Sequence, residues 1–138
     1  MTTNHENPFK GSAFTTILVV SDLAASGKFY TEVLGATLYR EYGGNSLVLE
    51  FLNNWILLVT PGDPTNDKPE TYYKPPVDKN TVSHSFTIRV ENCQNSYDVL
   101  KARGAKFITP PVSNGPETRC FFHDPDGHLF EISEYRPS

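Results

Sequence analysis

Short apolar runs and one helical pattern alternate in the first half of the chain. Residues 14–20 are rich in β-branched side chains, and Asp22 then suits the cap of a following helix. From Leu23 the larger side chains recur at helical spacing until Gly35, a residue type that commonly ends helices. Three strands are predicted after it, at residues 37–42, 46–51 and 55–60, with turn pairs at 43–44 and 53–54.

The same order of elements returns in the second half. Asn92 is the predicted cap of the second helix, which is followed by Gly104. The predicted elements are a strand at residues 85–90, a helix at 93–103, strands at 105–109, 118–122 and 129–134, and an irregular stretch at 110–116. The phrase after each helix is nearly the same, Gly-Ala-Thr-Leu-Tyr and Gly-Ala-Lys-Phe-Ile, so we predict an internal repeat of two β-α-β-β-β modules.

A proline-rich segment separates the two halves. Residues 61–80 contain five prolines, which lack the backbone donors that a helix or strand needs. We therefore interpret this segment as a linker or a lid. The predicted organisation is a flexible N-terminal arm at 1–13, a first module at 14–60, the linker or lid at 61–80 and a second module at 81–136.

Composition narrows the range of partners. The chain has 138 residues, with 12 Lys and Arg against 16 Asp and Glu, and this balance favours neither nucleic acid nor a membrane surface as a partner. Its apolar runs are far shorter than the ~20 residues that span a bilayer. The first residues lack the pattern of a secretory signal, so we expect a cytoplasmic protein. Cys93 and Cys120 form no Cys-x-x-Cys pair, and we interpret both as reduced packing residues.

Several motifs resemble those of one superfamily. The first helix opens with Val20-Ser-Asp-Leu and carries Phe29-Tyr30-x-x-Val33-Leu34-Gly35, and Phe122-x-Asp124-Pro-Asp-Gly127-x-x-x-Glu131 stands near the end. With the paired modules, these resemble the vicinal-oxygen-chelate superfamily of glyoxalase I, bleomycin-resistance proteins, fosfomycin-resistance enzymes and extradiol dioxygenases. The resemblance covers residues 14–135. It implies an α+β fold, the glyoxalase/bleomycin-resistance fold, in which two βαβββ modules form a cupped mixed sheet around a cavity, and a chain that pairs as a homodimer.

The resemblance also implies four inward positions where metal-dependent members hold a divalent ion. The first-strand positions correspond to Thr15 and Ser85, and neither side chain is a usual ligand of a catalytic metal. The last-strand positions correspond to Glu131 and, when the two last strands are overlaid, to Leu58. Since one donor in four remains, we expect no metal and no other cofactor.

Histidines near these positions leave a metal site as an alternative. His84 precedes the expected ligand position by one residue, so in regular register it points away from the cavity, and a β-bulge would re-aim it. The alternative is one divalent metal ion held by His84 and Glu131, in a glyoxalase-like lyase or a dioxygenase. His123 and His128 flank a tight turn and match no ligand pattern, and the aspartates of that turn are expected to bond its own backbone.

Glu131 is the candidate catalytic residue. Strand alternation places it on the cavity wall, where it would contact a ligand, act as a general base or accept a hydrogen bond from Arg89, Ser85 or Thr15. The predicted ligand-binding residues are Thr15, Ile17, Trp55, Leu58, Ser85, Thr87, Arg89, Phe122, Glu131 and the linker residues Tyr72 and Tyr73, and Val19, Ile56, Thr60, Leu129 and Ser133 complete the predicted wall. Such a wall suits a medium-sized, partly aromatic organic molecule.

Three hypotheses of function follow. The leading one is metal-free binding of a small, partly apolar organic molecule, as in drug-sequestering members of the superfamily, or a metal-free isomerase-like or cyclase-like reaction at Glu131. The second is the metal-dependent lyase or dioxygenase. The third is a purely structural or protein-interaction module, for which the only signal is the tendency of this fold to dimerise.

Overall fold

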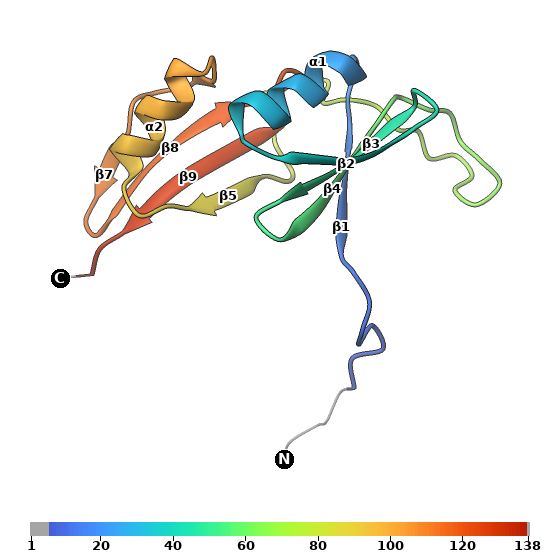
Figure 1. The fold of residues 1–138 in the computed structure, drawn as a ribbon, viewed down its shortest axis with the longest axis horizontal. Helices are drawn as coiled ribbons and strands as arrows, with labels where there is room; N and C mark the ends of the chain where they lie inside the picture. The colour runs from blue at the N-terminus through green and yellow to red at the C-terminus, as the bar shows by residue number, and fades with distance from the viewer. Residues whose placement is uncertain (1–5, 138) are drawn as a thin grey trace.

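Two β-α-β-β-β modules follow each other along the chain (Figure 1). The computed structural model describes residues 6–137, so residues 1–5 of the predicted arm and Ser138 lie outside the described residues. The first module consists of β1 (Thr15–Val19), α1 (Leu23–Lys28), the π-helical segment η1 (Phe29–Val33), β2 (Thr37–Tyr42), β3 (Ser46–Phe51) and β4 (Asn54–Val59). Its sheet has the order β1-β4-β3-β2, with β1 parallel to β4.

The second module repeats this plan and adds one strand. It consists of β5 (Phe86–Arg89), α2 (Cys93–Ala102), β6 (Lys106–Phe107), β7 (Val112–Asn114), β8 (Glu117–His123) and β9 (Leu129–Tyr135). The sheet order is β5-β9-β8-β6, and β7 pairs with β8. The predicted α+β class with two βαβββ modules and mixed strand pairing is confirmed, and the strands form two sheets, one in each module. The prediction of an irregular stretch at 110–116 was wrong at β7, because its three exposed residues carry no apolar alternation.

Side-chain caps begin both helices at the predicted residues. Asp22 accepts a hydrogen bond from the amide of Ala25 at 3.0 Å, and Asn92 caps α2 in the same way. The first helix differs from the prediction because it widens to a π-helix at Phe29. There the Thr31 hydroxyl donates to the carbonyl of Gly27 at 2.9 Å. Within residues 6–137, no helix is long and apolar enough to cross a membrane.

Each sheet has one face covered by helices and one helix-free face, which is the face opposite α1 and α2 (Figure 1). Buried residues on the helix-covered side alternate with more exposed residues on the helix-free face. The helix-covered side includes Leu18, Ile56, Leu58, Cys120, Phe122, Phe130 and Ile132. The helix-free face includes Thr15, Ile17, Val19, Trp55, Leu57 and Val59 in the first sheet, and Thr87, Arg89, Phe121, Glu131 and Ser133 in the second.

The face predicted for β4 was wrong by one residue. Leu58 is fully buried opposite Leu18, and Ile56 is buried on the same side, so neither lies on the helix-free face. The strand is apolar on both faces, and alternation alone therefore did not reveal its orientation. The ladder pairs Ile17 with Leu57 and Thr87 with Glu131, which makes Leu57 the counterpart of Glu131.

Two further residues of the predicted wall also fall elsewhere. Phe122 is fully buried in the core, with ring centroids 5.1 Å from Phe107 and 5.3 Å from Phe130. Thr60 lies past the end of β4, where its amide donates to the carbonyl of Asn45 at 3.2 Å. Both residues therefore stabilise the fold rather than line the helix-free face.

The turn between β8 and β9 joins the two modules. The hydroxyl of Tyr30, in η1, donates to the Asp124 carboxylate at 2.7 Å, and both side chains are buried. Asp126 accepts a hydrogen bond from the amide of Ser21 at 3.0 Å, and Nε2 of His128 lies 2.8 Å from the carbonyl oxygen of Val19. We call this set of contacts the module clamp.

The aspartates of the module clamp bond to their own turn, as predicted, and also to the first module, which was not predicted. Asp124 does bond its own turn, since it accepts from the amides of Asp126 at 2.9 Å and His128 at 2.8 Å. The contacts with the first module were not predicted, because they join residues about a hundred positions apart. Burial raises the pKa of Asp124, and burial followed by the charge of Asp124 raises the pKa of Tyr30.

The module clamp predicts that removing the Tyr30 hydroxyl strongly lowers the stability of the fold. We expect Tyr30→Phe to lower the free energy of unfolding by about 1.5–3 kcal/mol, because the buried Asp124 loses a donor. Tyr42→Phe is the matched control, since this half-exposed ring should give a change within about 0.5 kcal/mol. Urea unfolding monitored by circular dichroism measures both, and equal effects of the two substitutions would contradict the role of the clamp.

The orientation of β4 predicts opposite outcomes at two adjacent leucines. Leu58→Asn should lower the free energy of unfolding by about 3 kcal/mol or more, because it places an amide in the apolar core. Leu57→Asn, on the helix-free face, should cost less than about 1 kcal/mol. Thermal and urea unfolding of the two variants test this, and a larger loss at Leu57 would reverse the assignment of faces.

Candidate functional site

The helix-free face of the first sheet is an apolar wall. Trp55 contacts Tyr39 edge to face, with ring centroids 5.1 Å apart, and Tyr39 lies at a bulge between Leu38 and Arg40 that turns its side chain toward this face. A hollow of about 300 Å³ is lined by Ala13, Thr15, Tyr39, Val48, Trp55 and Leu57. Aromatic and aliphatic side chains of this kind suit the flat, apolar part of a small molecule.

The helix-free face of the second sheet is polar, and Glu131 lies at its centre. The Glu131 carboxylate accepts a hydrogen bond from Thr87, directly across the parallel ladder, and lies 3.5 Å from Nη1 of Arg119. Its side chain is 15% exposed. Glu117 pairs with Arg119 at 3.4 Å and with Arg89 at 3.9 Å. We call Thr87, Arg89, Glu117, Arg119 and Glu131 the Glu131 cluster.

The partners of Glu131 differ from those predicted. The sequence indicated Arg89, Ser85 or Thr15, whereas the structure supplies Thr87 and Arg119. Thr87 was already a predicted site residue, and it is the direct ladder partner of Glu131. Arg119 was missed because its strand neighbours become known only when β8 is paired with β9, where Arg119 lies diagonal to Glu131.

A hollow at the seam of the two sheets is lined by one residue of the apolar wall and one residue of the Glu131 cluster. Trp55 from β4 and Thr87 from β5 both line this hollow, which has a volume of about 230 Å³. Its other walls are Phe14, Thr16, Phe51, Leu52, Asn54, Ile56, Phe86, Ile88 and Phe130. Ile56, Phe86 and Phe130 belong to the helix-covered side, so Trp55 and Thr87 are the lining residues that come from the helix-free face, and Glu131 does not line the hollow.

The donor set on this face does not fit the divalent metal that the superfamily implies. The inward positions are Thr15, Leu57, Ser85 and Glu131, which supply two hydroxyls, one alkyl group and one carboxylate. Within residues 6–137, no group of three or more His, Cys, Asp or Glu side chains is arranged to hold a metal ion. A site for a catalytic divalent ion needs more nitrogen or carboxylate donors than this.

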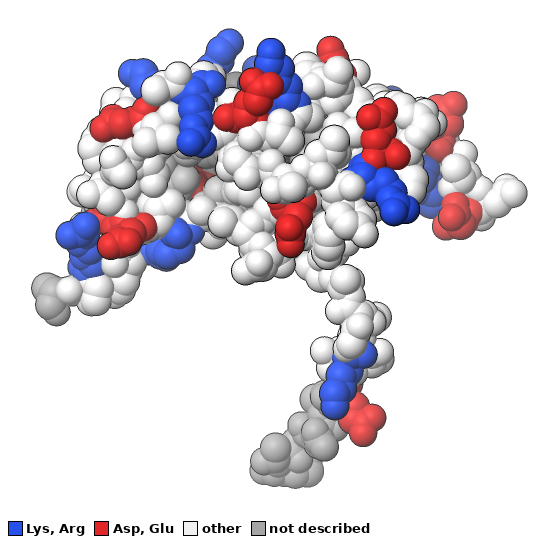
Figure 2. All heavy atoms as spheres, in the orientation of Figure 1, with Lys and Arg blue, Asp and Glu red and all other residues white. Residues whose placement is uncertain are grey.

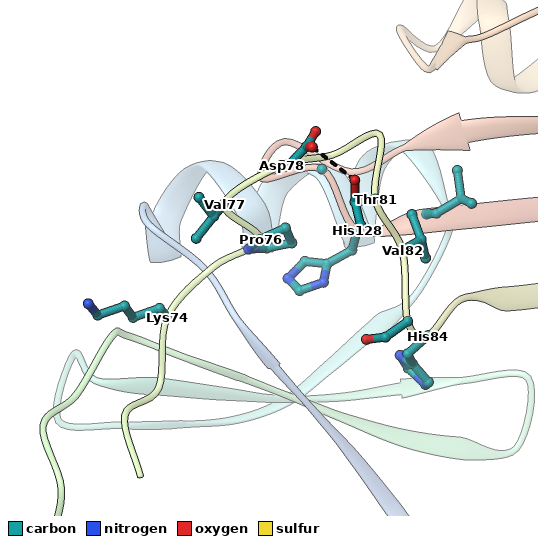
Figure 3. Close-up of a pocket in the computed structure, with 11 residues that line it drawn as sticks. Lys74, Pro76, Val77, Asp78, Thr81, Val82, His84 and His128 are labelled. Carbon is teal, nitrogen blue, oxygen red and sulfur yellow. Dashed lines mark hydrogen bonds between the residues drawn. The ribbon is translucent and has the colours of Figure 1, made fainter. Parts of the chain in front are cut away.

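His84 lies on the opposite side of β5 from Glu131. Its ring contacts Phe86 edge to face at 4.6 Å, and Phe86 stacks on the buried Phe130, whereas Thr87 and Glu131 share the helix-free face. Figure 3 shows the segment from Lys74 to His84 passing over His128. This segment and the turn before β9 enclose a hollow of about 460 Å³. The structure therefore does not bring His84 and Glu131 together.

The linker tyrosines contact lysines of their own segment. Nζ of Lys74 lies 5.2 Å from the ring centre of Tyr72, and Nζ of Lys68 lies 4.8 Å from that of Tyr73. Backbone hydrogen bonds of 3.0 and 2.9 Å between Gly62 and Tyr73 close the segment into a loop. That these tyrosines close over a ligand stays a prediction.

The face drawn in Figure 2 has no extended patch of one charge sign. Lys and Arg side chains alternate with Asp and Glu over both modules, and a largely uncharged area lies between them. The view gives no sign of a basic surface of the kind that binds nucleic acid.

Comparison with known proteins connects this geometry to a family. The model of the Glyoxalase/Bleomycin resistance protein/Dioxygenase superfamily matches residues 13–132. A probable lactoylglutathione lyase of Vibrio parahaemolyticus is 30% identical, over 88% of this chain and 89% of that protein. The probable lactoylglutathione lyase, chloroplastic, of Arabidopsis thaliana is 32% identical over 86% of this chain, which spans about a third (34%) of that protein.

Solved structures show the same fold. A glyoxalase/bleomycin resistance protein/dioxygenase from Alicyclobacillus acidocaldarius superposes with a TM-score of 0.69 at 20% identity, and the match covers 95% of each chain. The fosfomycin resistance protein FosX of Listeria monocytogenes gives a TM-score of 0.66 at 16% identity, over 89% of this chain and 92% of that one. The family model, the relatives and the paired modules together show that this chain belongs to the glyoxalase/bleomycin resistance protein/dioxygenase superfamily, the vicinal-oxygen-chelate superfamily.

Proposed function

We propose that this protein binds a small, partly apolar organic molecule on the helix-free face, without a catalytic metal. The observation that carries the proposal is that Trp55 of the apolar wall and Thr87, which donates a hydrogen bond to Glu131, both line the hollow at the seam of the two sheets. A ligand with a flat apolar body would pack on Trp55 and Leu57. Its polar end would reach the carboxylate of Glu131.

The chemistry of the Glu131 cluster favours a ligand with a hydrogen-bond donor or a positive charge. Thr87 and Arg119 hold the carboxylate in place, and a carboxylate is an acceptor only. An amine or hydroxyl group of the ligand would complete its coordination. If the bound molecule is also converted, Glu131 is the group placed to take its proton.

Lyase activity is the second candidate function, and the names of the relatives favour it. Two of them are called probable lactoylglutathione lyases, and a third, from Serratia marcescens at 29% identity, is called glutathione transferase FosA. All three names refer to reactions of small molecules. A metal-dependent form of this activity would need His84 on the face that carries Glu131, together with one more ligand.

We further propose that the protein acts as a homodimer in the cytoplasm. The isolated chain exposes large apolar side chains beside the helix-free face of the first sheet, with Phe14 at 87%, Tyr39 at 63% and Ile17 at 44% exposure. Apolar surface of this kind is commonly covered by a partner. A second copy would cover it and deepen the apolar wall.

Glu131 should control the affinity for an amine but not for a matched alcohol. Trp55 is the only tryptophan of the chain, so its fluorescence reports a ligand in the seam hollow. We expect biphenylmethylamine to quench Trp55, and Glu131→Gln to raise its Kd about tenfold, because the charge-assisted hydrogen bond is lost. The Kd of biphenylmethanol should change less than about threefold, because its hydroxyl also bonds to an amide.

Glu41→Gln is the control for this experiment, because it removes one carboxylate from an exposed position of β2. Its Kd for the amine should equal that of the unmodified protein. The proposal fails if Glu131→Gln binds the amine as tightly as the Glu41 variant does. It also fails if neither probe changes the Trp55 fluorescence at millimolar concentration.

A further inference from the structure

Two cysteines that lie apart in the sequence are in contact in the core. Cys93 is the first residue of α2 and Cys120 lies in β8, and their Sγ atoms are 4.0 Å apart. Both are free thiols with at most 1% exposure. Their contact lies on the helix-covered side of the second sheet, away from the Glu131 cluster.

We propose that Cys93 and Cys120 form an intramolecular disulfide when the protein meets a disulfide or peroxide oxidant. The bond would join the start of α2 to β8. With glutathione disulfide as oxidant, one thiolate attacks a glutathione sulfur and releases the first glutathione thiolate. The second cysteine thiolate then attacks the protein sulfur of this mixed disulfide and releases the second. The two cysteines lose two protons and two electrons, and glutathione disulfide is reduced to two thiols.

The geometry requires little movement. A disulfide has a sulfur–sulfur distance of about 2.05 Å, so each Sγ has to move by about 1 Å from the reduced arrangement. Rotation about the Cα–Cβ bonds of the two cysteines is the movement required. The carboxylate of Glu134 accepts a hydrogen bond from the Cys93 amide at 2.8 Å, which holds the start of α2 beside the sheet.

The surroundings of the thiols make the reaction slow rather than impossible. Burial raises the pKa of Cys93, and burial followed by the charge of the neighbouring Cys93 raises the pKa of Cys120 to about 12. The thiolate is the reactive form, so the rate should increase as the pH rises toward these values. The oxidant also has to enter, which requires the first turn of α2 to open.

Peptide mapping of the native protein tests the proposal. After treatment with glutathione disulfide and blocking with N-ethylmaleimide, trypsin should release Cys93 in peptide 90–101 and Cys120 in peptide 120–138. We expect these two peptides to be joined, with a mass two hydrogens below their sum, and to separate on reduction. The oxidised protein should not become disulfide-linked between chains on a non-reducing denaturing gel. Its Tm should rise by about 5 °C or more, because the crosslink restricts the unfolded chain.

Cys93→Ser and Cys120→Ser are the control variants. Neither should show the joined peptides or a rise in Tm after the same treatment. If either variant fails to fold, the map of the unmodified protein still decides the question. Two thiols that both remain free for alkylation after prolonged oxidation at pH 8.5 would overturn the proposal, as would cysteines linked only between copies.

Discussion

The hydrogen bond between the Tyr30 hydroxyl and the buried Asp124 carboxylate joins two modules that otherwise have separate sheets. Asp124 is costly to bury as an ion, and the raised pKa of its carboxyl group records that cost. Three donors offset it, namely the Tyr30 hydroxyl and the amides of Asp126 and His128. Because the same turn also bonds to Ser21 and Val19, the clamp sets how the edge of the first sheet lies against the second.

This arrangement gives the helix-free face two different halves. Leu57 and Glu131 occupy equivalent positions in the two modules, and Ile17 and Thr87 are their equivalent neighbours on the first strands. One module therefore presents alkyl and aromatic groups where the other presents a carboxylate held by a hydroxyl and a guanidinium group. Although the two modules repeat the same fold, their equivalent positions carry different side chains, so the helix-free face is amphipathic. Such a surface favours a ligand with one apolar and one polar end.

Much of the fold could be predicted because its signals are local. Asp22 and Asn92 begin the helices, Gly35 and Gly104 follow them, and the repeated phrase after each helix reveals the modules. The orientation of β4 could not be predicted, since five consecutive apolar side chains fit either face. No local pattern points to β7, which is held by its pairing with β8 rather than by burial of its side chains.

The candidate site was predictable in part for the same reason. Glu131 and Thr87 follow from the motif and from strand alternation, and the structure pairs them. Arg119 contacts Glu131 only because β8 and β9 are antiparallel neighbours, so no local pattern points to it. Cys93 and Cys120 were interpreted as separate packing residues, and their contact depends on how α2 crosses the sheet.

The central claim is that Glu131 serves a ligand directly rather than through a metal ion. Plasma mass spectrometry of tag-free protein, before and after loading with Zn²⁺, Ni²⁺, Mn²⁺ and Fe²⁺, tests it most directly. The account predicts less than about 0.1 ion per chain under every condition, because one carboxylate with two hydroxyl groups is too poor a donor set. About one ion per chain, lost in Glu131→Ala but kept in Glu41→Ala, would contradict the account and favour the metal-dependent lyase.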